Sequence, residues 1–173
     1  MDTDITTKFT IATERGIGVL LNLTQTIVRE KFSALLPMES IESYLSQTFN
    51  EKALMVEVNS MSNQWLVVYK NEKAVGFARI TSKGERPKTI FQKRVIRIAD
   101  FGIVKEYTDP AIRQSLFDKC LSVCKGYEVV WINEYLENPL ISFFESEGFT
   151  KQEGNAKLDE LPLQSVCLTR QLN

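Results

Sequence analysis

The sequence predicts an α+β domain in which helices cover both faces of a mixed, largely antiparallel sheet. Apolar residues at helical spacing fill the first third of the chain, a β-rich hairpin follows, and a strand–helix–strand crossover comes next. The chain has 173 residues, of which 43% are hydrophobic. This length is enough for one domain with a buried core, which we expect to span residues 1–173.

The bulk composition argues against several partner classes. The formal net charge is −1, so no long-range field favours binding to nucleic acid or to an anionic membrane. No apolar run approaches the ~20 residues that a membrane-spanning helix needs. The first ten residues are acidic and polar, unlike a signal peptide. We therefore expect a cytoplasmic protein.

The first elements follow from apolar spacing. A short strand is expected at Lys8–Ala12, and a helix at 17–32, where apolar residues form one face. After the break at Pro37, the same pattern predicts a second helix over 38–50. A weaker pattern predicts a third helix over 51–59.

The rest of the chain alternates strands and helices. Residues 64–80 form two β-rich runs around the polar turn Asn71–Lys73, which predicts a hairpin, and residues 89–104 are expected to form one long strand. A helix is expected next over 111–125, ended by Gly126, and then a strand over 128–133. A further helix is expected over 138–147, capped by Asn138 and closed by Gly148. The last elements are expected to be strands over 149–154 and 164–172.

Cysteine and histidine usage limits the chemistry. The chain has three cysteines and no histidine. Cys120 and Cys124 lie four residues apart on one helical face, but a thiolate zinc site needs about four ligands. Small buried hydrophobic residues are the favoured interpretation, and no metal is expected. Acid–base chemistry would have to use carboxylate, tyrosine, cysteine, lysine or water.

Three stretches resemble the GNAT N-acyltransferase superfamily. The segment WLVVYKNEKAVGFARI (65–80) resembles its second and third strands, with the recurring glycine at Gly76. IADFGIVKEY (98–107) resembles its fourth strand and exit, and NPLISFFESEGF (138–149) resembles its late helix. SIESYLSQTFN (40–50) is similar to the polyamine-acetylating PaiA branch. The resemblance implies a GNAT fold, with a fourth strand that splays from the fifth.

The resemblance also implies acetyl-CoA as cosubstrate and an amine that attacks the thioester directly. Strand-edge amides near Phe101 and Ile103 would bind the pantetheine arm. The family's pyrophosphate loop falls on residues 108–113, where Thr108, Ala111 and Arg113 occupy the three signature positions and differ from the pattern.

Two interpretations of this altered loop stay open. Pro110 removes one N–H donor and Asp109 adds a negative charge, so the segment could be a capped helix start that binds no CoA. Alternatively, the backbone amides of Ala111, Ile112 and Arg113 form a weakened cradle, with the Arg113 side chain as a further phosphate donor.

The late helix departs from the family as well. The family's tyrosine, which protonates the leaving thiolate, is matched by Phe144. The position of its asparagine is matched by Glu137, and Asn138 comes one place late. We include Asn138 and Phe144 among the expected cofactor contacts. Tyr107 and Tyr135 are candidate replacement proton donors.

Candidate general bases lie on the fourth and fifth strands. Asp100 is expected on one face with Ile98 and Gly102, either as a base or as a structural ion pair with Arg97 or Arg79. A weaker candidate set lies at the end of the fifth strand, namely Glu134 and Glu137.

The sequence therefore predicts acetyl transfer to the primary amine of a small, polyamine-like molecule. The alternative is a non-catalytic GNAT-fold protein with weak or lost CoA binding, which acts as a ligand-binding or interaction module. A third interpretation is an unrelated α+β protein, which a closed sheet between the fourth and fifth strands would support. A homodimer is one assembly that the chain could form.

Overall fold

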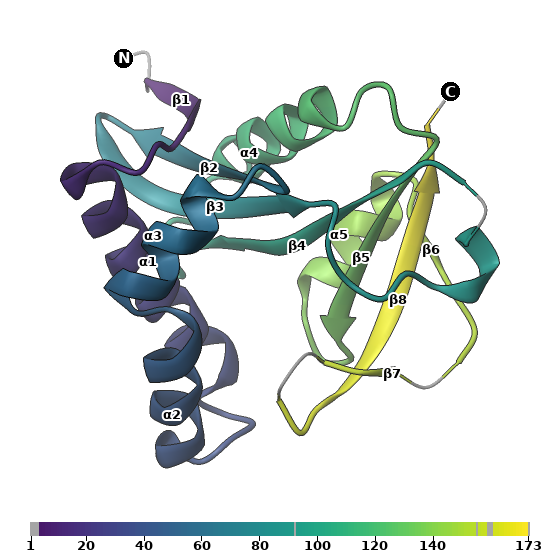
Figure 1. Ribbon diagram of the computed structural model, residues 1–173, viewed down its shortest axis with the longest axis horizontal. Coiled ribbons are helices and arrows are strands. Elements are labelled where there is room, and N and C mark those ends of the chain that lie inside the picture. The colour runs from purple at the N-terminus through teal and green to yellow at the C-terminus, as the bar shows by residue number, and fades with distance from the viewer. Residues whose placement is uncertain (1–3, 92, 155, 159–160, 173) are drawn as a thin grey trace.

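A computed structural model describes residues 4–91, 93–154, 156–158 and 161–172 (Figure 1). In chain order, the elements are β1 (Ile5–Phe9), α1 (Glu14–Phe32), α2 (Met38–Thr48), α3 (Glu51–Asn59), β2 (Asn63–Lys70), β3 (Lys73–Thr81), the 3-10 helix η1 (Lys88–Ile90), β4 (Val95–Ile103), α4 (Pro110–Val123), β5 (Val129–Tyr135), α5 (Leu140–Ser146), β6 (Thr150–Lys151), β7 (Ala156–Lys157) and β8 (Gln164–Gln171). Among the described residues, no helix has the length and apolar character to cross a membrane.

Within the described residues, the strands form one eight-stranded sheet in the order β1-β2-β3-β4-β5-β8-β6, and β7 also pairs with β8. The pairs are antiparallel except β4 and β5, which run parallel. A parallel pair needs a crossover connection, and α4 supplies it. The predicted mixed, mostly antiparallel sheet is confirmed.

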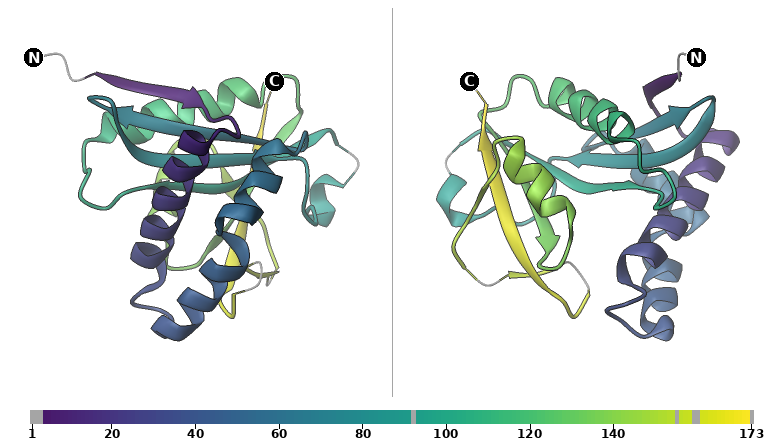
Figure 2. Two further views of the ribbon diagram at one scale, coloured as in Figure 1. Left: turned by 60° about the vertical axis from the view of Figure 1, so that its left-hand side comes forward. Right: turned by 180° about the vertical axis from the view of Figure 1, so that it is seen from behind.

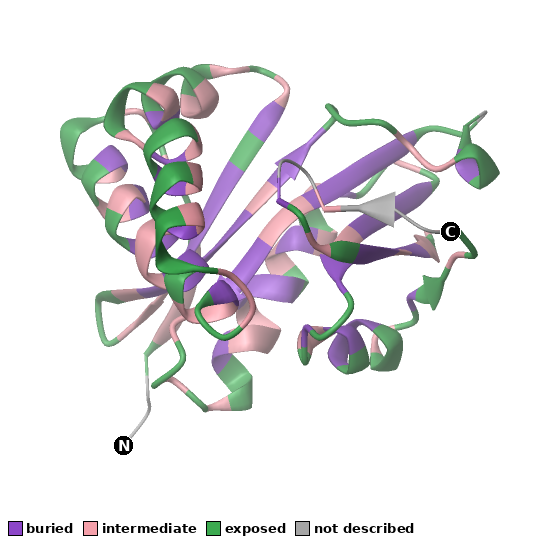
Figure 3. Cartoon of the chain, turned by 90° about the horizontal axis from the view of Figure 1, so that it is seen from below, coloured by how far each residue is buried: buried purple, intermediate pink, exposed green. Residues whose placement is uncertain are grey.

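Strand β2 shows why helices cover both faces of this sheet. Trp65 and Val67 pack with α1, α2 and α3, whereas Leu66 and Val68 point the other way and pack with α4 and α5. All four side chains are at most 2% exposed. The two groups of helices lie on opposite sides of the strands (Figure 2). The central strands β2 to β5 are largely buried, while the helices keep an exposed side (Figure 3).

Strands β4 and β5 pair over only four residues and then separate. The parallel register runs from Val95↔Val129 to Ile98↔Ile132. Beyond this point β4 stays with β3, and β5 stays with β8. Ala99 is an unpaired bulge residue in β4, because Arg79 pairs with Asp100 and the next residue of β3 pairs with Ile98. A bulge bends its strand, and the ends of β4 and β5 diverge (Figure 1). The predicted split is confirmed.

The turn predictions are confirmed in detail. Asn71 and Glu72 form the two-residue turn between β2 and β3, with φ values of 48° and 67°. Positive φ at both positions is what the twist of a tight hairpin requires, and asparagine tolerates it. Gly126 follows α4 with φ 96°, which a side chain would strain.

Three strand predictions are wrong in their bounds. Of the strand expected over 149–154, only Thr150–Lys151 forms β6. The first strand covers Ile5–Phe9 instead of Lys8–Ala12, because Thr13 turns the chain and caps α1 through the backbone N–H of Gly16. The expected strand over 89–104 begins only at Val95. Its first part folds into η1, where backbone turns join 87 to 90 and 90 to 93, and Arg86 donates to the carbonyl oxygens at 91 and 93.

Candidate active site

Two cavities reach the split between β4 and β5. One, of about 840 Å³, lies between the helices α1, α2 and α3 and the sheet, and we call it the broad cavity. The other, of about 550 Å³, is lined by the end of β4, the loop 104–109, Tyr135, and the starts of α4 and α5, and we call it the loop cavity. Ile27 and Lys31 of α1 line both cavities. The two cavities therefore adjoin each other beside α1, where they share part of their lining.

Lys31 lies at this junction. Its ammonium nitrogen Nζ donates to the carbonyl oxygen of Phe101 at 2.9 Å and lies 3.6 Å from Oε1 of Glu134. Phe101 belongs to β4 and Glu134 to β5, so one side chain of α1 connects both strands where their own ladder has stopped. The Phe101 carbonyl, which belongs to the stretch expected to bind the pantetheine arm, therefore has a partner within the protein.

Glu134 is a buried carboxylate with defined partners. Its residue is 5% exposed, and its Oε2 accepts from Nδ2 of Asn138 at 2.7 Å. Asn138 is 4% exposed, and its Oδ1 accepts from the backbone N–H of Leu140 at 2.9 Å. Asn138 thus holds the start of α5 and orients Glu134, as its predicted capping role requires. The other oxygen of Glu134 is directed to the junction.

Two tyrosines line the loop cavity. Tyr135 is 5% exposed and its hydroxyl donates to the backbone oxygen of Lys31 at 3.5 Å. Burial, with the nearby charges of Glu134 and Glu137, raises the pKa of Tyr135 to about 12. Tyr107 also lines this cavity, and the ammonium group of Lys73 lies 5.6 Å from its ring centroid. Both candidate tyrosines of the sequence prediction therefore lie on the lining of the loop cavity.

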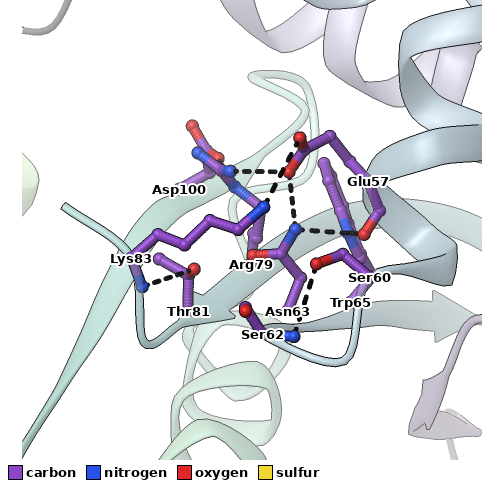
Figure 4. A network of polar contacts seen from close by, with 9 residues as sticks. All are labelled: Glu57, Ser60, Ser62, Asn63, Trp65, Arg79, Thr81, Lys83 and Asp100. Carbon is purple, nitrogen blue, oxygen red and sulfur yellow. Dashed lines mark hydrogen bonds and ion pairs between the residues drawn. The ribbon is translucent and has the colours of Figure 1, made fainter.

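The wall of the broad cavity carries a network of paired charges (Figure 4). Nε of Arg79 lies 2.7 Å from Oδ2 of Asp100, and its Nη1 lies 3.5 Å from Oε2 of Glu57. Lys83 and Asn63 also contact Glu57. Burial lowers the pKa of Arg79, but Asp100 and Glu57 outweigh it, so the net shift is upward. Of the two interpretations of Asp100, the structural ion pair is the one present.

The predicted orientation of Asp100 is only partly right. Asp100 and Gly102 both face α1 and its cavities, as expected. The prediction that Ile98 shares this face is wrong, because Ile98 packs in the core under α4 and α5. The bulge at Ala99 inserts one residue between them and reverses the alternation.

The segment before α4 is a capped helix start. Oδ1 of Asp109 accepts from the backbone N–H of Ala111 at 3.0 Å, and the Asp109 carbonyl accepts from that of Ile112 at 3.1 Å. Lys70 lies 3.9 Å from the other carboxylate oxygen of Asp109. Two of the three amides that were expected to form the cradle are therefore already bonded within the chain.

The structure brings together about half of the predicted cofactor residues. Those that line the loop cavity are Ile103, Thr108, Arg113 and Asn138. The others lie elsewhere. Ala111 lines a shallow hollow next to β1, Ile112 is 0% exposed in the core, and Phe144 is 0% exposed among Phe101, Phe117 and Phe149.

The cysteines take no part in this arrangement. Cys120 and Cys124 are buried, and burial raises the pKa of the Cys124 thiol to about 12 and also raises the pKa of the Cys120 thiol. They pack as small apolar groups in the core under α4. Among the described residues, His, Cys, Asp and Glu side chains form no group of three that could hold a metal ion.

Comparisons with known proteins show which fold this chain has. No family model matches the sequence, and no curated protein sequence matches it either. The structure is similar to that of the PaiA N-acetyltransferase from Thermoplasma acidophilum in complex with coenzyme A, with a TM-score of 0.77 and 14% identity over 98% of this chain and 99% of that chain. A GNAT-family acetyltransferase from Staphylococcus aureus gives a TM-score of 0.69 and 14% identity over 98% and 100% of the two chains.

An acetyltransferase from Thermus thermophilus is also similar, with a TM-score of 0.65 and 12% identity over 96% of this chain and 97% of that chain. This chain has the GNAT fold. The closed sheet that would have supported the third interpretation is not found, because β4 and β5 separate after four paired residues. At these low identities the likeness concerns the fold, and the PaiA type stays a prediction.

Within this GNAT fold, sequence reasoning missed Lys31 and Glu57. The signal for Lys31 was present, because it follows Ile27 by four residues and thus lies on the buried face of α1. A lysine on an apolar face is a candidate for a buried ion pair. Glu57 gave no such signal, because its partners Arg79 and Lys83 come from a hairpin whose register the sequence does not specify.

Proposed function

We propose that this protein transfers an acetyl group from acetyl-CoA to the primary amine of a small molecule by direct attack. The observation that supports the proposal is the meeting of two cavities at the split, with Ile27 and Lys31 lining both. A thioester donor in the loop cavity and an amine in the broad cavity would approach each other there. The PaiA enzyme of similar fold, crystallised with coenzyme A, supports the choice of donor.

In this proposal, Glu134 is the proton acceptor. The nitrogen lone pair of the amine attacks the thioester carbonyl carbon, the carbon–sulfur bond breaks, and the thiolate leaves. The extra proton on nitrogen passes to Oε1 of Glu134, directly or through water, while Asn138 keeps the carboxylate in place. Asp100 is the second candidate base, but its contact with Arg79 gives it a positioning role.

Tyr135 or Tyr107 would return a proton to the thiolate. The raised pKa of Tyr135 keeps its hydroxyl protonated at neutral pH, so a proton is available. Both side chains line the cavity that would hold the donor. The loop-cavity residues Ile103, Thr108 and Asn138 would contact CoA.

A polyamine-like acceptor is part of the proposal. The broad cavity is lined by three carboxylates, those of Glu57, Asp100 and Glu134, which are suited to ammonium groups. Each one also contacts a lysine or arginine of the protein, so a polyamine would have to share or displace these partners.

A non-catalytic GNAT-fold protein is the second candidate. Two observations favour it: Asp109 occupies the N–H of Ala111, and Lys31 occupies the carbonyl of Phe101. In this case the loop cavity would bind CoA weakly or not at all, and the protein would act as a ligand-binding or interaction module.

Calorimetry with acetyl-CoA, followed by chromatographic assay of acetyl transfer to a panel of amines that includes spermidine, separates the two candidates. The first predicts binding and a product peak above the uncatalysed background. Absence of binding at millimolar acetyl-CoA would refute it. Product formation with any amine of the panel would refute the second candidate, and the order of rates across the panel tests the polyamine prediction.

A further inference from the structure

The start of α4 does not offer a free backbone cradle. The N–H groups of Ala111 and Ile112 bond to Asp109, and the residue before them, Pro110, has no N–H. The methyl group of Ala111 lies at a hollow beside β1 instead of in the loop cavity. An anion in the loop cavity would therefore need a donor other than these amides.

The side chain of Arg113 is the candidate for that donor. Arg113 follows Asp109 by one helical turn and lines the loop cavity. Its guanidinium carbon lies 4.1 Å from the ring centroid of Phe143, a side chain that is 7% exposed and packs against Phe117. A guanidinium that stacks on a fixed ring has fewer orientations to lose when it binds a ligand.

The guanidinium has no polar partner within the described chain. Nε of Arg113 is buried without a hydrogen bond, and no hydrogen bond or ion pair joins its terminal nitrogens to a described residue. The other cations that line the loop cavity differ from it. Lys31 already bonds to Phe101 and Glu134, and Lys105 is exposed on the loop.

We propose that the loop cavity binds the diphosphate of acyl-CoA through the side chain of Arg113, which replaces the backbone amides of the helix start. The planar fork of terminal nitrogens matches two phosphate oxygens, and Thr108 on the same lining can donate a further hydrogen bond. This inference rests on the proposed function, because it assigns a residue to the donor site of that reaction.

The test compares ligands with and without the diphosphate. Calorimetry measures the Kd of CoA, of pantetheine and of inorganic pyrophosphate for the unchanged protein and for Arg113→Gln, Arg113→Lys and Lys119→Gln. Lys119 is the matched control, because it is a cation of the same helix that also lies over a phenylalanine ring, 5.0 Å from that of Phe9, but away from the loop cavity.

We expect Arg113→Gln to weaken CoA binding by about 10- to 100-fold and to leave pantetheine within about twofold, because one charge-assisted contact is lost. Arg113→Lys should recover part of the loss, and Lys119→Gln should change nothing. An equal weakening of CoA and pantetheine, or no weakening by Arg113→Gln, would overturn the inference.

The pyrophosphate arm separates the inference from the proposed function. If the unchanged protein binds pyrophosphate in an Arg113-dependent way but binds neither CoA nor pantetheine, the anion site exists and the acetyltransferase proposal fails. If it binds CoA while Arg113→Gln has no effect, the function survives and the assignment of Arg113 fails. If it binds none of the three ligands, both fail.

Discussion

The broad cavity and the loop cavity lie on two sides of the same split, but their charges are arranged differently. On the wall of the broad cavity, Arg79 is paired with Asp100 and Glu57. In the loop cavity, Arg113 has only a ring beneath it. Charges that pair within the protein mainly fix the position of strands and helices, whereas a cation without a polar partner can still bind a ligand. Glu134 and Lys31 lie between these two regions.

The largest expected effect is the difference in kcat between variants of two carboxylates near the junction, Glu134 and Asp100. We expect Glu134→Gln to lower kcat by about 10²- to 10⁴-fold, because it removes the proton acceptor and keeps the shape of the side chain. Asp100→Asn should leave kcat within about threefold and instead lower the free energy of unfolding by about 1–2 kcal/mol, through its lost contact with Arg79. Steady-state kinetics and urea unfolding measure both. A larger kcat loss in Asp100→Asn would reverse the two roles.

The next effect concerns the ion pair at the junction. Lys31→Met leaves the 5% exposed Glu134 without its cation, and we expect the free energy of unfolding to fall by about 2–4 kcal/mol. Lys52→Met is the control, because Lys52 is an exposed lysine on the rim of the broad cavity. Equal urea midpoints for the two variants would show that the Lys31 contacts contribute no stability.

A smaller effect is expected at Phe144, the position that the GNAT resemblance matches to a tyrosine. Phe144→Tyr places a hydroxyl in the aromatic core, where Phe144 is 0% exposed, and we expect a loss of about 1–3 kcal/mol in stability with no gain in kcat. Ser142→Ala, on the exposed side of the same helix, is the control. A rise in kcat would mean that position 144 reaches the thiolate after all.

The smallest effect is expected at Asp109. Asp109→Asn keeps an oxygen that can cap α4 but removes a negative charge near the loop cavity, so CoA should bind about two- to fivefold more tightly, with unchanged stability. Calorimetry at low and high salt measures the change, which should shrink at high salt because ions screen the charge. Weaker binding in the variant would show that the Asp109 charge supports the ligand.

Local sequence determined the elements of this protein. Apolar spacing predicted α1, α2 and α3, the turn at Asn71 predicted the hairpin, and Gly126 and Gly148 follow the two helices that they were expected to end. These features depend on backbone preferences and on side-chain periodicity, which act over a few residues. The resemblance to GNAT proteins predicted the split between β4 and β5, which the apolar periodicity alone does not predict.

The tertiary structure decided the site. The bulge at Ala99 turned Asp100 away from the face of Ile98, and the approach of α1 to the split placed Lys31 beside Glu134. The packing of α5 against α4 put the ring of Phe143 under Arg113. Such contacts join residues far apart in the chain, and they depend on strand register and side-chain packing that no local pattern specifies. For this reason the sequence left open whether Arg113 is a phosphate donor or part of a helix start that binds no CoA. The fold showed that Arg113 lines the loop cavity.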